Sequence, residues 1–159
     1  MSANTVFGKI ISGGQTGADQ GALDAALELG HLCGGWCPKN RTSEAGRIPD
    51  IYPLQEHASE NHAARTEANV QDSDGTLIFT TGKPEGGTAL TVECARRHFK
   101  PYLIIDLSLG SRAVDLQKIW QWGHEHEVFV LNVAGPRESK SPGIQDAVQA
   151  LVRKLLTEF

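Results

Sequence analysis

The residues best suited to chemistry form a glycine-rich stretch near the start of the chain, Gly13-Gly14-Gln15-Thr16-Gly17-Ala18-Asp19. Glycine allows positive φ angles and lets a ligand approach the main chain closely. If a helix follows, its unpaired N–H groups and positive dipole end face the same ligand. The stretch therefore predicts a cradle for a small anion such as phosphate; a tight turn with close helix packing is the alternative. No Gly-Lys-Ser/Thr follows, which disfavours a P-loop nucleotidase.

Two further stretches have a similar composition. One is Thr80-Thr81-Gly82-Lys83-Pro84-Glu85-Gly86-Gly87-Thr88, and the other is Asn132-Val133-Ala134-Gly135-Pro136-Arg137. Both are expected to follow parallel strands, and ligands bind outside the carboxyl ends of such strands. Two glycine turns on one sheet edge predict a shared anion site more strongly than either turn alone. Arg137 would bind a phosphate in a bidentate mode, or lie solvated on its loop.

Arg65 is in an unusual position. The run Arg65-Thr66-Glu67 is expected to open a short helix, where a cation is unfavourable beside the positive dipole end. This local conflict indicates either contact with a ligand or partner, or a salt bridge to Glu67 or Asp19.

Patterns typical of metal sites are weak. Cys33 and Cys37 form one C-x3-C pair without the further ligands that structural zinc needs. His124 and His126 would diverge near a helix end. No serine or cysteine lies in a pattern typical of a nucleophilic triad. We therefore predict no metal site and no catalytic residue.

Hydrophobic patterning predicts the elements that would position these turns. Strands are expected over residues 9–12, 31–36, 75–80, 101–106 and 127–133. Helices are expected over 18–30, 65–72 and 88–98, with a last helix that has Ser141 and Pro142 at its start.

The alternation of strands and helices predicts an α/β fold: a single three-layer Rossmann-like domain over residues 1–159, with a mainly parallel sheet of about five strands. An α+β fold with some antiparallel pairing is the alternative. The irregular segment 37–62 is expected to be a long loop on the ligand side, or a surface excursion over a sheet edge.

Composition and charge limit the classes of ligand that the chain is expected to bind. The 159-residue chain has a net charge of −4, which argues against a nucleic-acid duplex as ligand. Its basic residues nevertheless gather in the connections, at Lys39, Arg41, Arg47, Arg65, Lys83, Arg137 and Lys140. This placement predicts a local anion pocket. The three cysteines, and the lack of a leader-like start or of an apolar run of membrane-spanning length, predict a cytoplasmic protein with reduced thiols and no membrane association.

The glycine stretches resemble the molybdenum cofactor carrier family over nearly the whole chain. The resemblance includes Gly34-Gly35-Trp36-Cys37-Pro38-Lys39 and Asp72-Ser73-Asp74-Gly75-Thr76-Leu77-Ile78. That family is similar to the Rossmann-like lysine-decarboxylase-like (LOG, SLOG) superfamily. The resemblance implies a homo-oligomer, a tetramer or a dimer, that binds molybdenum cofactor and protects or stores it. Molybdoenzymes or cofactor-insertion proteins would be its partners.

The expected ligand is anionic, a pterin with a terminal phosphate and a dithiolene that already holds molybdenum, so no structural metal is required. Trp36 or Tyr52 would stack on the pterin. The expected binding residues are Gly13, Gly14, Gln15, Thr16, Gly17, Ala18, Asp19, Trp36, Lys39, Arg65, Thr80, Gly86, Gly87, Thr88, Asn132, Gly135 and Arg137.

Two other functions stay open. Related nucleotide phosphoribohydrolases look like Pro-Gly-Gly-x-Gly-Thr-x-x-Glu at the second glycine turn. Here Thr91 stands where their glutamate is expected, and Glu93 is displaced by about 200° around the helix. This departure disfavours that hydrolysis but leaves other chemistry with Asp19 or Glu67. A nucleotide-sensing module without turnover is the remaining alternative.

Overall fold

The computed structural model describes residues 5–110 and 112–158. The central sheet consists of β1 (Lys9–Ile11), β2 (Cys33–Gly34), β7 (Gly75–Thr80), β8 (Tyr102–Asp106) and β9 (Val130–Ala134). Short strands outside it are β3 (Trp36–Cys37), β4 (Thr42–Ser43), β5 (Gly46–Arg47) and β6 (Gln55–Glu56). The helices are α1 (Ala18–Glu28), the 3-10 helix η1 (Lys39–Arg41), α2 (His62–Asp72), α3 (Gly86–Arg97), α4 (Ala113–Glu125) and α5 (Ile144–Thr157).

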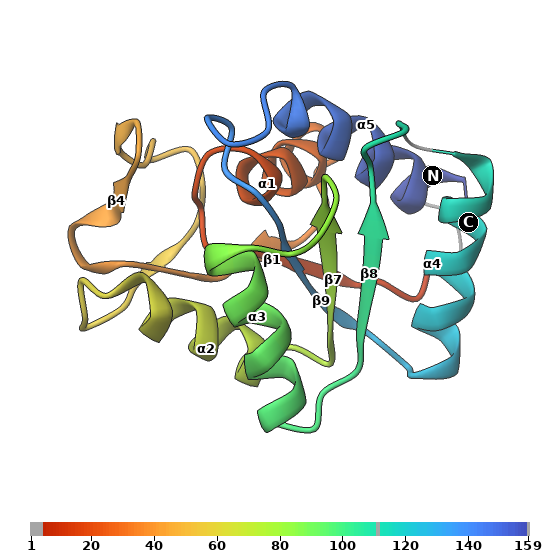
Figure 1. The fold of residues 1–159 in the computed structure, drawn as a ribbon, viewed down its shortest axis with the longest axis horizontal. Coiled ribbons are helices and arrows are strands. Elements are labelled where there is room, and N and C mark those ends of the chain that lie inside the picture. The colour runs from red at the N-terminus through yellow and green to blue at the C-terminus, as the bar shows by residue number, and fades with distance from the viewer. Residues whose placement is uncertain (1–4, 111, 159) are drawn as a thin grey trace.

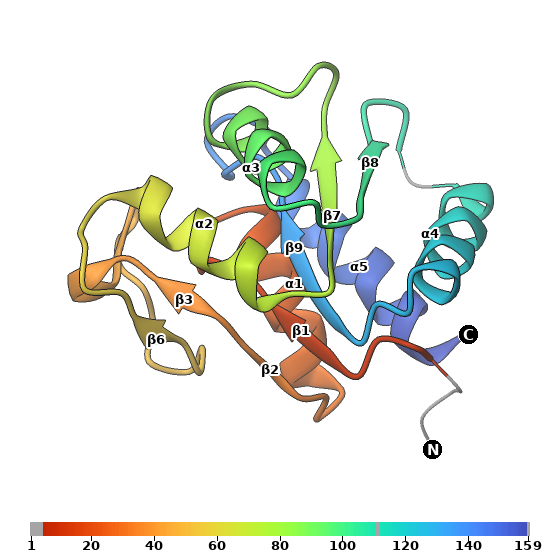
Figure 2. The same ribbon diagram turned by 90° about the horizontal axis from the view of Figure 1, so that it is seen from below.

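The central sheet is parallel throughout, in the order β2-β1-β9-β7-β8. Helices α1 and α5 pack on one face and α2 and α3 on the other, while α4 lies beside the edge strand β8 (Figures 1 and 2). All six residues of β7 are buried, as its continuous apolar run predicts for a strand covered on both faces. The predicted three-layer Rossmann-like α/β fold is confirmed.

Helix α5 completes the largest core cluster. Ile144, Val148, Leu151 and Leu155 recur at helical spacing and are at most 4% exposed. The predicted start of this helix is wrong by two residues. Its N-cap is Gly143, and the Glu138 carboxylate accepts hydrogen bonds from the N–H groups of Gly143 and Gln145. The Glu138 carboxylate thus satisfies N–H groups at the start of the helix, which is the capping role that we predicted for Ser141.

The predicted strand over residues 31–36 is interrupted. Gly35 adopts a φ of 125°, and a Cβ there would lie 2.2 Å from the Ser12 carbonyl oxygen. The chain bends at this close contact, so Cys33 and Gly34 pair with β1 whereas Trp36 and Cys37 pair with β6. Only glycine tolerates both the angle and the approach.

Two helices also differ from expectation. Helix α2 begins at His62 instead of Arg65, because the Asn61 side chain accepts a hydrogen bond from the Ala63 N–H and caps it. Sequence patterning indicates a helix end near His124 but predicts no bounds for α4, although Leu116 and Ile119 face the core at i, i+3 spacing.

Arg41 anchors the segment from Cys37 to His62. Its side chain is buried and donates hydrogen bonds to the carbonyl oxygens of Ile48, Pro49, Tyr52 and Leu54, at 2.7 to 3.3 Å. The side chain thereby gives several loop carbonyl groups a hydrogen-bond donor. From this base the β4–β5 hairpin projects with an exposed backbone.

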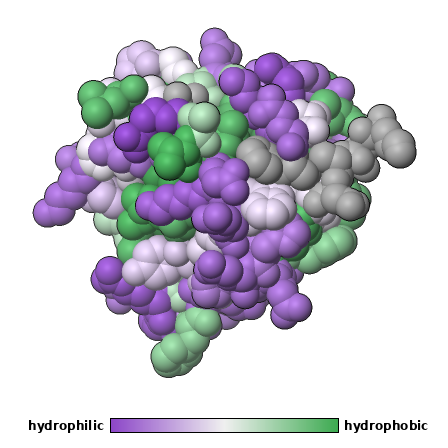
Figure 3. Space-filling view, turned by 90° about the vertical axis from the view of Figure 1, so that its right-hand side faces the viewer, coloured by the Kyte–Doolittle hydropathy of each residue, from purple (hydrophilic) through white to green (hydrophobic). Residues whose placement is uncertain are grey.

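No described helix is long and apolar enough to cross a membrane. On the face that includes α4, hydrophobic side chains form groups interspersed with hydrophilic ones (Figure 3). Leu109 and Val114, beside the edge strand, are 88% and 60% exposed.

The role of Arg41 is testable by substitution. Arg41→Met should lower the free energy of unfolding by about 2–4 kcal/mol, because buried carbonyl groups lose their donors. Urea unfolding measures this change. Arg47→Met is the matched control, since Arg47 forms an exposed pair with Asp50 and its loss should change the free energy of unfolding little. Equal stability of the two variants would show that the Arg41 hydrogen bonds do not hold the segment.

Candidate functional site

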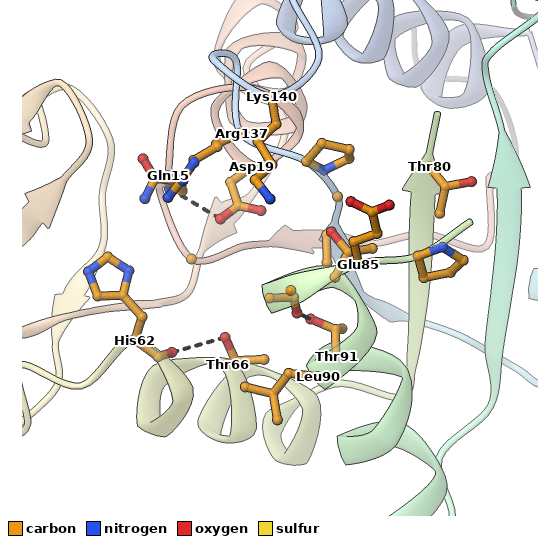
Figure 4. A pocket seen from close by; sticks show the side chains of 18 of the residues that line it. Gln15, Asp19, His62, Thr66, Thr80, Glu85, Leu90, Thr91, Arg137 and Lys140 are labelled. Atoms are coloured by element: carbon orange, nitrogen blue, oxygen red, sulfur yellow. Dashed lines mark hydrogen bonds between the residues drawn. The ribbon is translucent and has the colours of Figure 1, made fainter. Parts of the chain in front are cut away.

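A pocket of about 680 Å³ opens at the carboxyl ends of β1, β7 and β9. Helices α2 and α3 form one wall, and the turns before α1 and α5 form the other (Figure 4). This is the position at which open parallel sheets bind ligands, because successive strand-to-helix turns converge there. In Figure 4, Gln15, Asp19 and Arg137 lie together on one side of the pocket, with Glu85 and Thr91 on another.

The first glycine turn holds a buried ion pair. The Asp19 carboxylate accepts a hydrogen bond from Arg65 Nη1 at 3.1 Å and another from the Gln15 N–H. The two charged side chains are 7% and 12% exposed. A Cβ on Gly13 would lie 1.5 Å from Arg65 Nη1, so the guanidinium requires the glycine. The odd placement of Arg65 is thus explained by the salt bridge to Asp19.

Most of the amides of this turn already have acceptors. The Thr16 N–H donates to Gln15 Oε1, the Gly17 N–H to Gln145 Oε1, and the Ala18 N–H to the Pro136 carbonyl. A helix N-terminus binds an anion through unpaired N–H groups. The first turn is therefore a packed junction between α1 and α5, which corresponds to the alternative interpretation of its glycines.

The second glycine turn is open. Among the described residues, none accepts a hydrogen bond from the N–H groups of Gly86 or Gly87, at the start of α3. A Cβ on either glycine would meet no atom within 4 Å. Nearby, the Thr80 side chain is buried and its hydroxyl has no partner. This turn has the unpaired donors that an anion needs.

The third turn contributes both packing and charge. A Cβ on Gly135 would lie 2.7 Å from Ala18 Cβ, which explains the glycine by close helix packing. The Asn132 amide is buried and donates to Thr76 Oγ1. Arg137 lies at the rim, half exposed, with its Nε 3.2 Å from a Glu44 carboxylate oxygen.

The pocket brings together eleven of the predicted site residues: Gly13, Gln15, Asp19, Arg65, Thr80, Gly86, Gly87, Thr88, Asn132, Gly135 and Arg137. Gly14, Thr16, Gly17 and Ala18 belong to the first turn but do not line it.

The structure does not bring Trp36 and Lys39 to this pocket. The Trp36 indole N–H donates to Asp72 and its ring borders a separate cavity of about 310 Å³. Lys39 is exposed in η1. Tyr52, the other expected stacking ring, is buried in a second core cluster and donates its hydroxyl to Asp24.

Sequence reasoning missed Glu44, His62 and Asn69, which line the pocket. An N-cap signal at Asn61 could have placed His62 on the first turn of a helix. Glu44 has no such signal, because the segment around it lacks periodicity.

The pocket has four cationic side chains and three carboxylates. Arg65, Lys83, Arg137 and Lys140 line the pocket together with the carboxylates of Asp19, Glu44 and Glu85. Burial raises the pKa of Asp19, and Arg65 opposes that shift. Burial lowers the pKa of His62, and Arg65 and Arg137 act in the same direction, so its imidazole is neutral at pH 7.

No three His, Cys, Asp or Glu side chains gather into a possible metal site within residues 5–110 and 112–158. The three cysteines are free; Cys37 and Cys94 are buried, and Cys33 is half-buried.

Comparison with known proteins agrees with the fold. The model of the circularly permutated YpsA SLOG family matches residues 10–156. A crystal structure of a "putative molybdenum carrier protein" from Syntrophus aciditrophicus SB is 45% identical, with a TM-score of 0.93, over 99% of this chain and 98% of that chain. A search of curated proteins found no match. The resemblance inferred from the glycine stretches is therefore confirmed, and the chain belongs to the circularly permutated YpsA SLOG family.

Proposed function

We propose that this protein is a carrier that binds molybdenum cofactor in the 680 Å³ pocket and protects or stores it. Support comes from family membership and from the name of the 45% identical neighbour. The pocket has the size of a small-molecule site and lies where parallel sheets bind ligands.

Gly87 is the single observation that carries the proposal. It occupies the second position of α3, where glycine is less favourable than alanine by up to about 1 kcal/mol. Nothing within 4 Å would contact a Cβ there, so packing does not explain the glycine. The space is explained if a ligand approaches the backbone at this point. The free N–H groups and the positive end of α3 then suit the terminal phosphate of the cofactor.

Cationic side chains favour the same ligand. Arg65, Lys83, Arg137 and Lys140 all line the pocket, in a chain whose net charge is −4. Lys83 lies within the open turn, between β7 and α3, and carries a charge that phosphate accepts as a partner. Stacking on Trp36 or Tyr52 is not part of the proposal, because neither ring lines the pocket.

The residues at α3 favour a carrier over a phosphoribohydrolase. Thr91 stands where the hydrolase pattern has glutamate, and its hydroxyl donates to the Gly87 carbonyl at 3.0 Å. Glu93 is exposed and does not line the pocket. Asp19 is engaged by Arg65. These contacts position backbone groups for binding and leave no carboxylate at the expected place for hydrolysis.

The proposal includes a cytoplasmic homo-oligomer that delivers cofactor to molybdoenzymes or insertion proteins. Free thiols at all three cysteines agree with a reducing compartment. Among the described strands, β8 pairs with β7 alone, so one of its edges is open, and exposed Leu109 and Val114 lie beside it. Such an edge is a suitable surface for a second copy.

Release of the bound ligand tests the proposal directly. Protein purified from cells grown with molybdate should, on denaturation, release a pterin that fluoresces after oxidation, together with an equal amount of molybdenum. Fluorescence and elemental analysis measure the two. Release of a nucleotide, with neither pterin nor metal, would contradict the carrier function.

Substitution of Gly87 separates binding from stability. Gly87→Ala should leave the free energy of unfolding unchanged or raise it by up to about 1 kcal/mol, because alanine favours a helix and nothing crowds its Cβ. The same methyl group should reduce cofactor retention about tenfold, because it occupies the space that the phosphate needs. Urea unfolding and the released pterin measure the two effects.

Val114→Ala is the matched control, since Val114 occupies the second position of α4 and lies outside the pocket. It should retain cofactor as the unmodified protein does. Full retention by Gly87→Ala would place the phosphate elsewhere.

A further inference from the structure

Glu44 occupies a set of donors at the rim of the pocket. The residue lies at the tip of the β4–β5 hairpin, and its carboxylate accepts hydrogen bonds from the Thr16 hydroxyl at 2.5 Å and the Ser139 N–H at 3.1 Å. It also accepts one from the Ser139 hydroxyl and pairs with the Arg137 guanidinium at 3.2 Å. Although the hairpin backbone is exposed, the Glu44 side chain is only 19% exposed.

These donors form an oxyanion site by their chemistry. Two hydroxyls, one backbone amide and one guanidinium converge on a single acceptor group, and such sets bind phosphate and similar oxyanions. They come from two turns that are far apart in sequence, before α1 and before α5. A tetrahedral oxyanion has more oxygens and more negative charge than a carboxylate, so it can use the same donors fully.

The donors are held independently of Glu44. The Thr16 hydroxyl oxygen accepts a hydrogen bond from the Glu138 N–H at 3.2 Å, which joins the two turns. The Glu138 carboxylate in turn fixes the start of α5. Removing Glu44 would therefore leave in place the Thr16 hydroxyl and the backbone of the turn that carries Arg137 and Ser139.

Glu44 is also the attachment point of the hairpin. The base of the hairpin is fixed by Arg41 and Ile48, but every described hydrogen bond between residues 42–47 and the two turns involves Glu44. Apart from the carboxylate contacts, only the Glu44 N–H reaches the first turn, at Gln15 Oε1. Hydrogen bonds from Ser139 and Thr16 lower the pKa of Glu44, so the carboxylate is charged at neutral pH.

We propose that Thr16, Arg137 and Ser139 form a second oxyanion subsite at the rim of the pocket, where Glu44 and Arg137 line it, and that Glu44 occupies this subsite until a ligand displaces the carboxylate. This inference rests on the proposed function, because it adds a second anionic group to the ligand held at α3. The ligand therefore carries an oxyanion at two ends, as molybdenum cofactor does with its phosphate and its oxo-molybdenum group. Displacement frees the hairpin, whose Ser43 and Glu44 line the pocket.

Binding of inorganic phosphate and of molybdate to Glu44→Gln, followed by calorimetry at pH 7, tests the subsite. Loss of the competing charge should tighten the binding of at least one anion about tenfold, because charge-assisted hydrogen bonds become available to it. The anion that gains more identifies which end of the ligand the subsite takes. Asp50→Asn is the control: it removes one carboxylate from the same segment, 82% exposed and outside the pocket, and should bind both anions as the unmodified protein does.

A second variant assigns the effect to the donors. Adding Arg137→Met to Glu44→Gln should abolish the gain in affinity. A gain that survives Arg137→Met, or Glu44→Gln binding that is equal to or weaker than that of the unmodified protein, would overturn the subsite.

Hydrogen exchange is measured on the unmodified protein, so this test does not depend on whether a variant folds. Saturation with the anion should accelerate amide exchange in residues 42–47, because the hairpin loses its Glu44 contacts. Unchanged or slower exchange would overturn the displacement. The two proposals fail separately: a Glu44 effect without released pterin refutes only the carrier function, and released pterin without a Glu44 effect refutes only the subsite.

Discussion

The buried pair between Asp19 and Arg65 is the contact on which the site depends. It joins α1 to α2, which cover opposite faces of the sheet, across the end of β1. The guanidinium fits only because Gly13 has no side chain. Desolvation of two charges is costly, and removing one partner would leave the other buried and unpaired. The pair therefore fixes where the start of α2 lies against the first turn, and with it one side of the pocket.

The glycine turns differ in whether their backbone donors already have acceptors within the protein. The amides before α1 donate within the protein, to Gln145, Pro136 and Gln15, and so hold α1 against α5. The amides at the start of α3 are left without such acceptors. A glycine-rich turn is thus structural or ligand-binding according to whether its donors are already used. In this pocket the open donors lie at the start of α3, whereas the donors that Glu44 occupies lie on the turns before α1 and α5. A ligand with two anionic ends requires two separate sets of donors of this kind.

The sequence predicted the layers and the strand ends well, because these follow from local patterns. Gly75 to Thr80 is a near-continuous run of apolar and β-branched residues, and all of it is buried. The position of the pocket followed from the rule for parallel strands. What could not be predicted depends on distant partners: Gln145 satisfies Gly17 across 128 positions, and Gly35 bends the chain because it touches Ser12. Trp36 was assigned to the site by its neighbours in sequence, yet the bend at Gly35 directs it elsewhere.

The difference between groups that already have partners and groups that are free also explains why the pocket suits a carrier. Catalysis needs an acid or base held at the reacting atom, with a pKa tuned to the reaction. Here Asp19 is committed to Arg65, and Thr91 donates to the backbone of its own helix. The amides, hydroxyls and cations that remain bind anions without changing them, and they line the pocket beside the Glu85 carboxylate and the neutral His62 imidazole. A carrier must also release its ligand. A carboxylate that competes with the ligand for the same protein donors limits how tightly any anion is held. Glu44 is placed to act in this way, since its hairpin is anchored by Arg41 whether or not its carboxylate is bound.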